Sequence, residues 1–289
     1  RPEGPARPAG RPAPSPPVAA RPTTLSATEV ETLIRDPYAV YARRILGLRP
    51  LDPIGREIDA RDRGIALHDV MRRFAEDTAG DPAPDVAALL EAFDADMAGA
   101  HAPEALRRLW RARLARLAPV FLAEEAARRR MGAALGHEVD GRREGAGFAL
   151  RARADRIDRL TDGTLALYDY KTGAPPSEKQ IALFAKQLPL EAAIAEAGGF
   201  AGAPAARVSA LAHISLGGGR GAGEAVAVEG DPAALAAEAW DGLGALLAAY
   251  ARPETAYPAR ARPSHLSYDS DYDHLSRFGE WEDGDEAAP

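Results

Sequence analysis

The hydrophobic period of this 289-residue chain changes near residue 130, and no other feature limits its possible folds as strongly. Before that point, apolar residues recur at helical spacing, as at Leu67, Val70, Met71 and Phe74. After it, strand-like runs are separated by turns and helical segments. This order predicts an α/β protein with an N-terminal helical region.

Local signals give approximate bounds for the expected elements. Ser26 and Glu29 form a capping box, which predicts a helix start, and Pro37 predicts a break before residue 36. Thr161-Asp162-Gly163 predicts a tight hairpin. We expect helices over 26–35, 38–46, 62–79, 85–97, 103–130, 178–197 and 232–250, and strands over 135–143, 148–160, 164–171, 207–216 and 224–229.

Composition excludes several classes of protein and site. The chain has no cysteine, which excludes disulfides, cysteine-ligated zinc and cysteine nucleophiles. It has no apolar run long enough for a transmembrane helix and no basic-then-apolar leader, so we expect a cytoplasmic protein with no membrane partner. The net charge of −7 argues against binding nucleic acid over the whole surface. Any phosphate-binding surface should be local, and in the slightly basic first half.

The same composition suggests three regions. Residues 1–23 are rich in Pro, Ala, Gly and Arg and predict a semi-extended linker. A folded domain is expected over 24–263. Residues 264–289 form a polar tail with aromatic residues, which we expect to pack on that domain or extend from it.

The segment Leu165-Ala-Leu-Tyr-Asp-Tyr-Lys-Thr-Gly173 is the sharpest candidate for chemistry. Asp169 and Lys171 should share one face of a strand, and the predicted hairpin can bring Asp155 to the same place. Two aspartates beside a lysine can bind a hard divalent cation, and the lysine can neutralise charge that develops on a phosphate. The alternative is an ordinary surface ion pair.

Two further polar residues accompany that segment. Gly64 and His68 lie one turn apart at the edge of an apolar helix face, where the glycine leaves room for a close approach. Gln187 follows the strand on the next predicted helix and could hold a phosphate or a base edge. Each could also be a structural residue.

In chain order, Gly-x-x-x-His, Asp-Arg-Ile-Asp, Asp-Tyr-Lys-Thr-Gly and Gln resemble the RecB-type branch of the PD-(D/E)XK nucleases. The resemblance is greatest to the C-terminal nuclease domain of alphaproteobacterial AddB-type subunits of AddAB helicase–nucleases. The segment after residue 24 and the tail near residues 271–281 are also similar to that family, so the likeness spans most of residues 24–282.

The resemblance implies a restriction-endonuclease-like core, with a mixed central sheet flanked by helices. It implies that Mg²⁺ (or Mn²⁺) is held by His68, Asp155, Asp169 and the Tyr170 carbonyl, with Lys171 as the catalytic lysine and Gln187 in the following motif. It also implies DNA as substrate, a role in processing double-strand breaks, and an AddA-like helicase–nuclease subunit as partner.

The chain departs from that family at two positions. Glu191 stands where many relatives have a tyrosine four residues after the glutamine. Asp36 stands where a cysteine of an iron–sulfur cluster would be expected, so we expect no such cluster, and packing must hold the N-terminal helices. Two alternatives remain open: a stand-alone RecB-like or Cas4-like exonuclease, and a non-catalytic scaffold that binds DNA ends.

Other features rank lower. No Gly-Lys-Ser/Thr is present, so ATP hydrolysis would come from another domain or subunit. The glycine-rich segment 217–223 is interpreted as a strand connection. Glu138, His265 and His274 could approach a metal, but we interpret each more simply as a surface residue. The following arginines could contact DNA but more simply form the solvated face of a helix: Arg107, Arg108, Arg111, Arg113 and Arg116.

Overall fold

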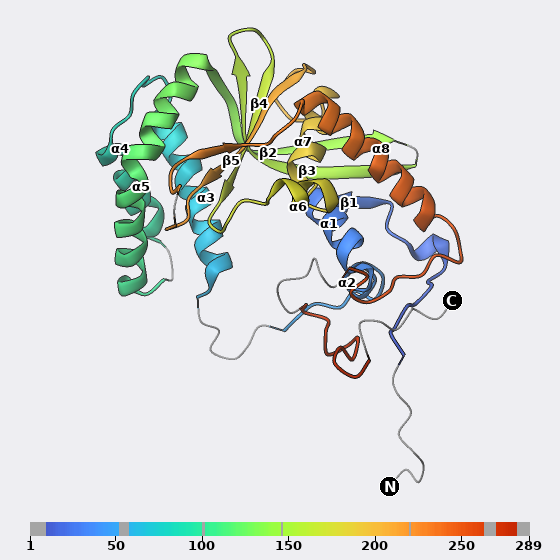
Figure 1. The fold of residues 1–289 in the computed structure, drawn as a ribbon. Helices are drawn as coiled ribbons and strands as arrows, with labels where there is room; N and C mark the ends of the chain where they lie inside the picture. Colours follow the sequence, from blue (N-terminus) through green and yellow to red (C-terminus); the bar gives the residue numbers. More distant parts are fainter. Residues whose placement is uncertain are drawn as a thin grey trace.

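The computed structural model describes residues 10–51, 58–99, 102–145, 147–219, 221–262 and 270–281. Within this part of the chain, a six-stranded mixed sheet lies between two layers of helices (Figure 1). The expected α/β core with a mixed central sheet flanked by helices is therefore confirmed. None of the described helices is both long and apolar enough to cross a membrane.

A long central strand, β3 (Phe148–Leu160), organises the sheet. The antiparallel β2 (Gly132–Gly145) runs along one edge of it. The other edge is shared by β1 (Thr24–Ser26), which is parallel, and β4 (Leu165–Lys171), which is antiparallel. Beyond β4 lie the parallel β5 (Val208–Ser215) and the antiparallel β6 (Ala225–Ala227). The predicted strands are confirmed, and β1 is an additional one.

Helices pack on both faces of the sheet. The described helices are α1 (Ala27–Arg35), α2 (Pro37–Val40), α3 (Ala60–Asp77), α4 (Val86–Met97), α5 (Glu104–Met131), α6 (Glu178–Leu183), α7 (Gln187–Glu196) and α8 (Pro232–Tyr250). A turn of π-helix, Tyr41–Ile45, continues α2. The predicted capping box is present, since Ser26 Oγ accepts the Glu29 amide at 3.1 Å and Glu29 Oε2 accepts the Ser26 amide at 2.9 Å.

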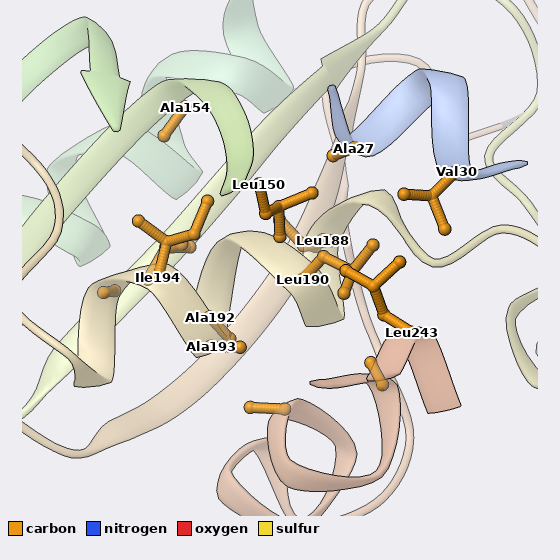
Figure 2. Close-up of a cluster of buried hydrophobic side chains, with 14 of the residues drawn as sticks. Ala27, Val30, Leu150, Ala154, Leu188, Leu190, Ala192, Ala193, Ile194 and Leu243 are labelled. Atoms are coloured by element: carbon orange, nitrogen blue, oxygen red, sulfur yellow. The ribbon is translucent and has the colours of Figure 1, made fainter. Parts of the chain in front are cut away.

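Two apolar clusters separate the helices by face. On one face, Leu165 and Leu167 of β4 pack with α1, α7 and α8. Helix α7 is buried on every side there, with Leu188, Leu190 and Ile194 at the centre of the cluster (Figure 2). On the other face, Tyr168 and Tyr170 of β4 pack with α3, α4 and α5. Alternate side chains of β4 thus pack against the helix layers on opposite faces of the sheet.

The single helix predicted over 178–197 is wrong, because the chain forms two helices, α6 and α7. Pro189 explains the break. In one continuous helix its ring would clash with the Ala185 carbonyl and it would supply no amide hydrogen. Starting α7 at Gln187 instead puts Pro189 in a first turn, where a missing amide costs nothing.

Both ends of the described chain pack on the domain. Residues 10–23, predicted to be a linker, run along the segment after α8. There the buried Arg21 guanidinium donates to the Tyr250 and Arg252 carbonyls at 2.6 and 2.9 Å. At the other end, Tyr272 and Trp281 pack against Tyr38. Packing therefore holds the N-terminal helices, as expected.

Asp36 takes part in the same contact between the two ends. Its Oδ1 accepts the Arg260 amide at 2.9 Å, and the Arg260 guanidinium binds Asp273. Asp36 is buried, and burial raises its pKa although the Arg260 amide opposes the shift. Asp36 therefore anchors the tail-side segment by a hydrogen bond.

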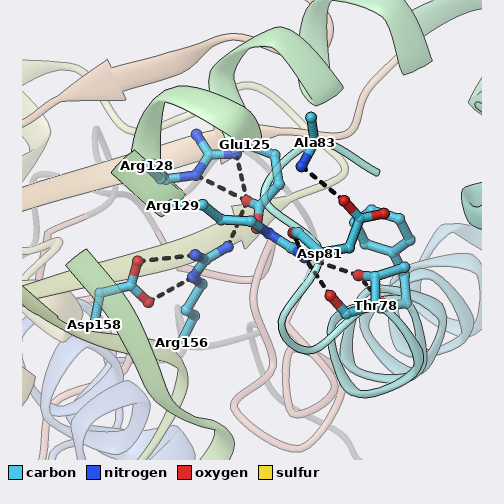
Figure 3. A network of polar contacts seen from close by, with 9 residues as sticks. Thr78, Asp81, Ala83, Glu125, Arg128, Arg129, Arg156 and Asp158 are labelled. Carbon is cyan, nitrogen blue, oxygen red and sulfur yellow. Dashed lines mark hydrogen bonds and ion pairs between the residues drawn. The ribbon is translucent and has the colours of Figure 1, made fainter. Parts of the chain in front are cut away.

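A buried ionic network joins α5 to the sheet (Figure 3). Glu125 accepts from Arg156 at 2.6 Å, Arg129 at 2.7 Å and Arg128 at 3.1 Å. Arg156 in turn donates to both oxygens of Asp158, at 2.7 and 2.8 Å. Burial alone would raise the pKa of Glu125, but the charges of Arg156 and Arg128 outweigh it and lower the pKa to about 2.

We predict that Glu125→Gln lowers the free energy of unfolding by about 3–5 kcal/mol, because it leaves buried guanidinium groups without their counter-charge. Urea denaturation at pH 7 measures this change. The difference between wild type and variant should shrink as the pH falls from about 4.5 toward 2, since a carboxyl with a lowered pKa loses its contribution when it is protonated.

The neighbouring substitution Glu124→Gln is the matched control and should change stability by less than about 0.5 kcal/mol. Equal stability of the Glu125 and Glu124 variants would contradict the role assigned to the network.

Candidate metal-dependent active site

Strand register lines up four polar residues across the sheet. In the β3–β4 hairpin Arg156 pairs with Tyr168, so the next position sets Asp155 opposite Asp169. In the β2–β3 hairpin His137 pairs with Arg156, and the following position sets Glu138 opposite Asp155. Asp169 in turn pairs with His213 of β5. Glu138, Asp155, Asp169 and His213 therefore form one row across β2, β3, β4 and β5.

His68 approaches this row from α3. Its Nε2 lies 2.9 Å from the Tyr170 carbonyl oxygen, and its Nδ1 lies 3.3 Å from Asp155 Oδ1 and 3.4 Å from Glu138 Oε1. One ligand atom from each of His68, Glu138 and Asp155 lies within 4.8 Å of the others. Asp155 Oδ2 also accepts the Tyr170 amide at 2.7 Å, which fixes the carboxylate. Two carboxylates and an imidazole can together hold a divalent metal ion.

The interpretation of Glu138 as a surface residue is wrong. Its side chain is only 15% exposed and belongs to the cluster. Its φ of 51° lies in a region that non-glycine residues rarely adopt, and such strain is common at functional sites. The sequence held a usable signal, because Glu138 and Asp155 are equally distant from the turn between Gly145 and Phe148.

The charges of the cluster balance one another. Burial alone would lower the pKa of His68, but the Asp155 and Glu138 carboxylates raise it to about 10. Burial and the negative charge of Asp169 raise the pKa of Asp155, against the effect of His68. Burial would also raise the pKa of Glu138, but the hydrogen bond from His68 lowers it. A protonated imidazole thus supplies the positive charge that the two acids require.

Asp169 forms a second group beside the first. Its carboxylate accepts from Lys171 Nζ at 2.8 Å, Gln187 Nε2 at 3.1 Å and His213 Nδ1 at 2.9 Å. Asp169 is almost fully buried, yet His213 and Lys171 lower its pKa. Burial would lower the pKa of Lys171, but Asp169 raises it. The pair is therefore ionised.

Gln187 connects this group to further buried acids. Its Nε2 donates to Glu191 Oε1 at 3.0 Å, and its backbone amide donates to Glu31 Oε1 at 3.2 Å. Burial and the charge of Asp169 raise the pKa of Glu191 well above its usual range. Glu191 thus lies behind Gln187 inside the protein.

The structure therefore divides the predicted site residues into two adjacent groups. His68 Nδ1, Asp155 and Glu138 form one group, and the Tyr170 carbonyl lies at the other ring nitrogen, His68 Nε2. Asp169, Lys171 and Gln187 form the other, together with His213, which the sequence analysis did not single out. The ligand atoms of Asp169 are not in the three-residue cluster.

Other candidates lie elsewhere. His274 is exposed, as expected, and His265 lies outside the described residues. On α5, Arg107 donates to the Met97 carbonyl, while Arg108 and Arg111 pair with Glu104 and Asp94. The segment after residue 216 connects β5 to β6, as predicted.

The chain was compared with known protein families, curated proteins and solved structures, and the matched region includes the candidate site. The model of the PD-(D/E)XK nuclease superfamily matches residues 24–265. An uncharacterized protein of Rickettsia conorii is 31% identical over 191 residues, 62% of this chain and 23% of its own length. Uncharacterized proteins of Rickettsia bellii and Rickettsia felis are 30% and 29% identical, also over 62% of this chain. The chain spans less than a quarter of the length of these relatives.

One solved structure, described as the crystal structure of SSO0001, covers 77% of this chain and 76% of its own. Its TM-score is 0.31 and its identity 15%, a similarity too weak to bear on fold or function.

We predict that divalent metal affinity rises with pH. The pKa of His68 is raised to about 10, so at neutral pH a metal must displace its proton. With one proton displaced, the dissociation constant for Mn²⁺ should fall about tenfold per pH unit below that pKa. Calorimetry in two buffers of different ionisation enthalpy measures the proton release.

His68→Gln carries no titrating group and is the matched comparison. It should bind Mn²⁺ more weakly and with little dependence on pH. A wild-type affinity that stays constant from pH 6 to pH 8 would refute the prediction.

Proposed function

The chain belongs to the PD-(D/E)XK nuclease superfamily, and from this premise we propose that it is a divalent-metal-dependent deoxyribonuclease. The observation that carries the proposal is the cluster of His68, Glu138 and Asp155 beside the ionised Asp169–Lys171 pair. Carboxylates that can hold a cation, next to a fixed ammonium group, are what hydrolysis of a phosphodiester requires.

The metal ligands we propose are Asp155, Glu138, His68 and the Tyr170 carbonyl, with Asp169 adjacent to them. Bound there, Mg²⁺ or Mn²⁺ would lower the pKa of a water and polarise the phosphate. Asp155 is oriented for this by the Tyr170 amide, and Glu138 by Arg153, whose Nε lies 3.0 Å from Glu138 Oε2. Partners of this kind fix the direction in which a ligand presents its lone pairs.

Lys171 is the residue that we propose stabilises the transition state. Asp169 holds Lys171 Nζ at 2.8 Å, and Gln187 Oε1 accepts from it at 3.4 Å. Its raised pKa keeps it protonated at neutral pH, so it offers a full positive charge at a defined point. Such a charge can orient the attacking water and neutralise charge on the phosphate oxygens.

For the biological setting, we propose processing of double-strand breaks beside an AddA-like helicase–nuclease subunit. The motif order shared with AddB-type domains supports this, as does the small share of each relative that the matched region occupies. Co-expression with the AddA-like subunit of the same genome tests it, with stimulation of cleavage as the expected result. Absence of both a stable complex and stimulation would favour a stand-alone exonuclease.

We predict that Lys171→Ala and Asp169→Ala each lower the rate of Mg²⁺-dependent cleavage of linear DNA by at least about 10²–10³-fold. The first removes the positive charge and the second removes its anchor. Chelation of the metal should abolish cleavage by the wild type. A labelled linear DNA, followed by gel electrophoresis over time, measures the rate.

Lys179→Ala is the control, because Lys179 is exposed on α6 and should leave the rate unchanged. Circular dichroism and thermal unfolding establish that each variant is folded. Wild-type cleavage by folded Lys171→Ala or Asp169→Ala would reject the roles assigned to these residues. A wild type that cleaves no DNA with Mg²⁺ or Mn²⁺ would favour a scaffold that binds DNA ends.

A further inference from the structure

Two arginines from different helices line one small pocket beside the end of β4. Arg63 comes from the first turn of α3 and Arg113 from the middle of α5, and Trp110 and Gly218 line the same pocket. The pocket lies on the α3–α5 side of the sheet. None of its lining residues takes part in the metal cluster or in the Asp169 group.

Arg63 is tied directly to the candidate active site. Its Nη2 donates to the Thr172 carbonyl at 3.4 Å, and Thr172 follows Lys171. No other hydrogen bond or ion pair of Arg63 is present among the described residues, so most of its donors are open. Arg63 precedes His68 by five residues on α3, an axial rise of about 7.5 Å.

Arg113 differs from Arg108 and Arg111 of the same helix. Arg108 pairs with Glu104, and Arg111 binds Asp94 through two hydrogen bonds near 2.8 and 2.9 Å. Arg113 is exposed and makes no ion pair or hydrogen bond within the described ranges. No acid among the described residues therefore pairs with its charge, in contrast to Arg108 and Arg111.

Leu216 and Gly218, which follow β5, border this pocket. At Gly217 a Cβ would lie 3.1 Å from the Thr172 carbonyl oxygen, so the loop passes close to the end of β4. At Gly218 and Gly219 a Cβ would meet nothing within 4 Å. Gly218 lines the pocket and adds no side chain to it.

We propose that Arg63 and Arg113 form a subsite for a backbone phosphate of the substrate strand, near the bond that is cleaved. The proposal rests on the nuclease activity proposed above and extends it. Guanidinium groups bind phosphate oxygens in a forked geometry, and contacts to phosphates position a strand without reading its sequence. The subsite thus selects a nucleic acid backbone, not a base.

The experiment measures binding of a fluorescently labelled single-stranded DNA by anisotropy, with Ca²⁺ as the divalent ion, over a range of salt concentrations. We expect Arg63→Ala and Arg113→Ala each to weaken binding about tenfold at low salt. Each should also reduce the slope of log affinity against log salt by about 0.7, because one phosphate contact is lost. Arg111→Ala, from the same helix, should change neither quantity.

Steady-state cleavage with Mg²⁺ supplies a second readout. Arg63→Ala and Arg113→Ala should raise KM about tenfold and leave kcat within about twofold, because the contact is made equally in the bound substrate and in the transition state. Arg63→Lys and Arg113→Lys should keep the salt slope and recover part of the affinity, since they keep the charge. This rescue separates loss of a phosphate contact from a general loss of structure.

The outcomes separate this subsite from the activity on which it rests. A wild type that binds and cleaves DNA, with folded Arg63→Ala and Arg113→Ala variants that keep its affinity, KM and salt slope, would overturn the subsite alone. A fall in kcat at unchanged KM would also overturn it. A wild type that neither binds nor cleaves DNA would overturn the proposed function and the subsite together.

Discussion

The register of β3 is the constraint on which both the fold and the candidate site depend. Asp155 and Arg156 are adjacent on this strand, and their side chains serve different parts of the molecule. Asp155 lies in the row of polar residues, whereas Arg156 binds Glu125 of α5 in the buried network. A slip of one residue would exchange the two faces. It would place a guanidinium at the metal site and a lone carboxylate under α5.

Charge balance explains why so many ionisable groups can be buried here. The carboxylates of the row are compensated by His68 on one side and by Lys171 and His213 on the other. Buried acids and bases without such partners would be strongly destabilising. A metal at the cluster would replace the positive charge of the imidazolium. The cluster thus has the charge distribution that a bound cation requires.

Much of this arrangement could be predicted from the sequence where a turn sets the register. The Asp162–Gly163 hairpin brings Asp155 opposite Asp169, as expected. The same counting at the β2–β3 hairpin leads to Glu138, which was assigned to the surface. His213 could not be found in this way, because β4 and β5 are parallel and a crossover through α6 and α7 sets their register. β1 is too short to show a period, and Pro189 signalled a break that the apolar pattern obscured.

The late start of α7 has an effect far beyond the helix itself. A first-turn amide has no partner within its own helix, and the Gln187 amide finds one in Glu31, on the first helix after the leading strand. Gln187, which accepts a hydrogen bond from Lys171, is thereby hydrogen-bonded to a residue 156 positions earlier in the chain. Helix α1 therefore helps to hold Gln187 in place beside Lys171. A change that displaces α1 would be expected to shift Gln187 before the other residues of the candidate site.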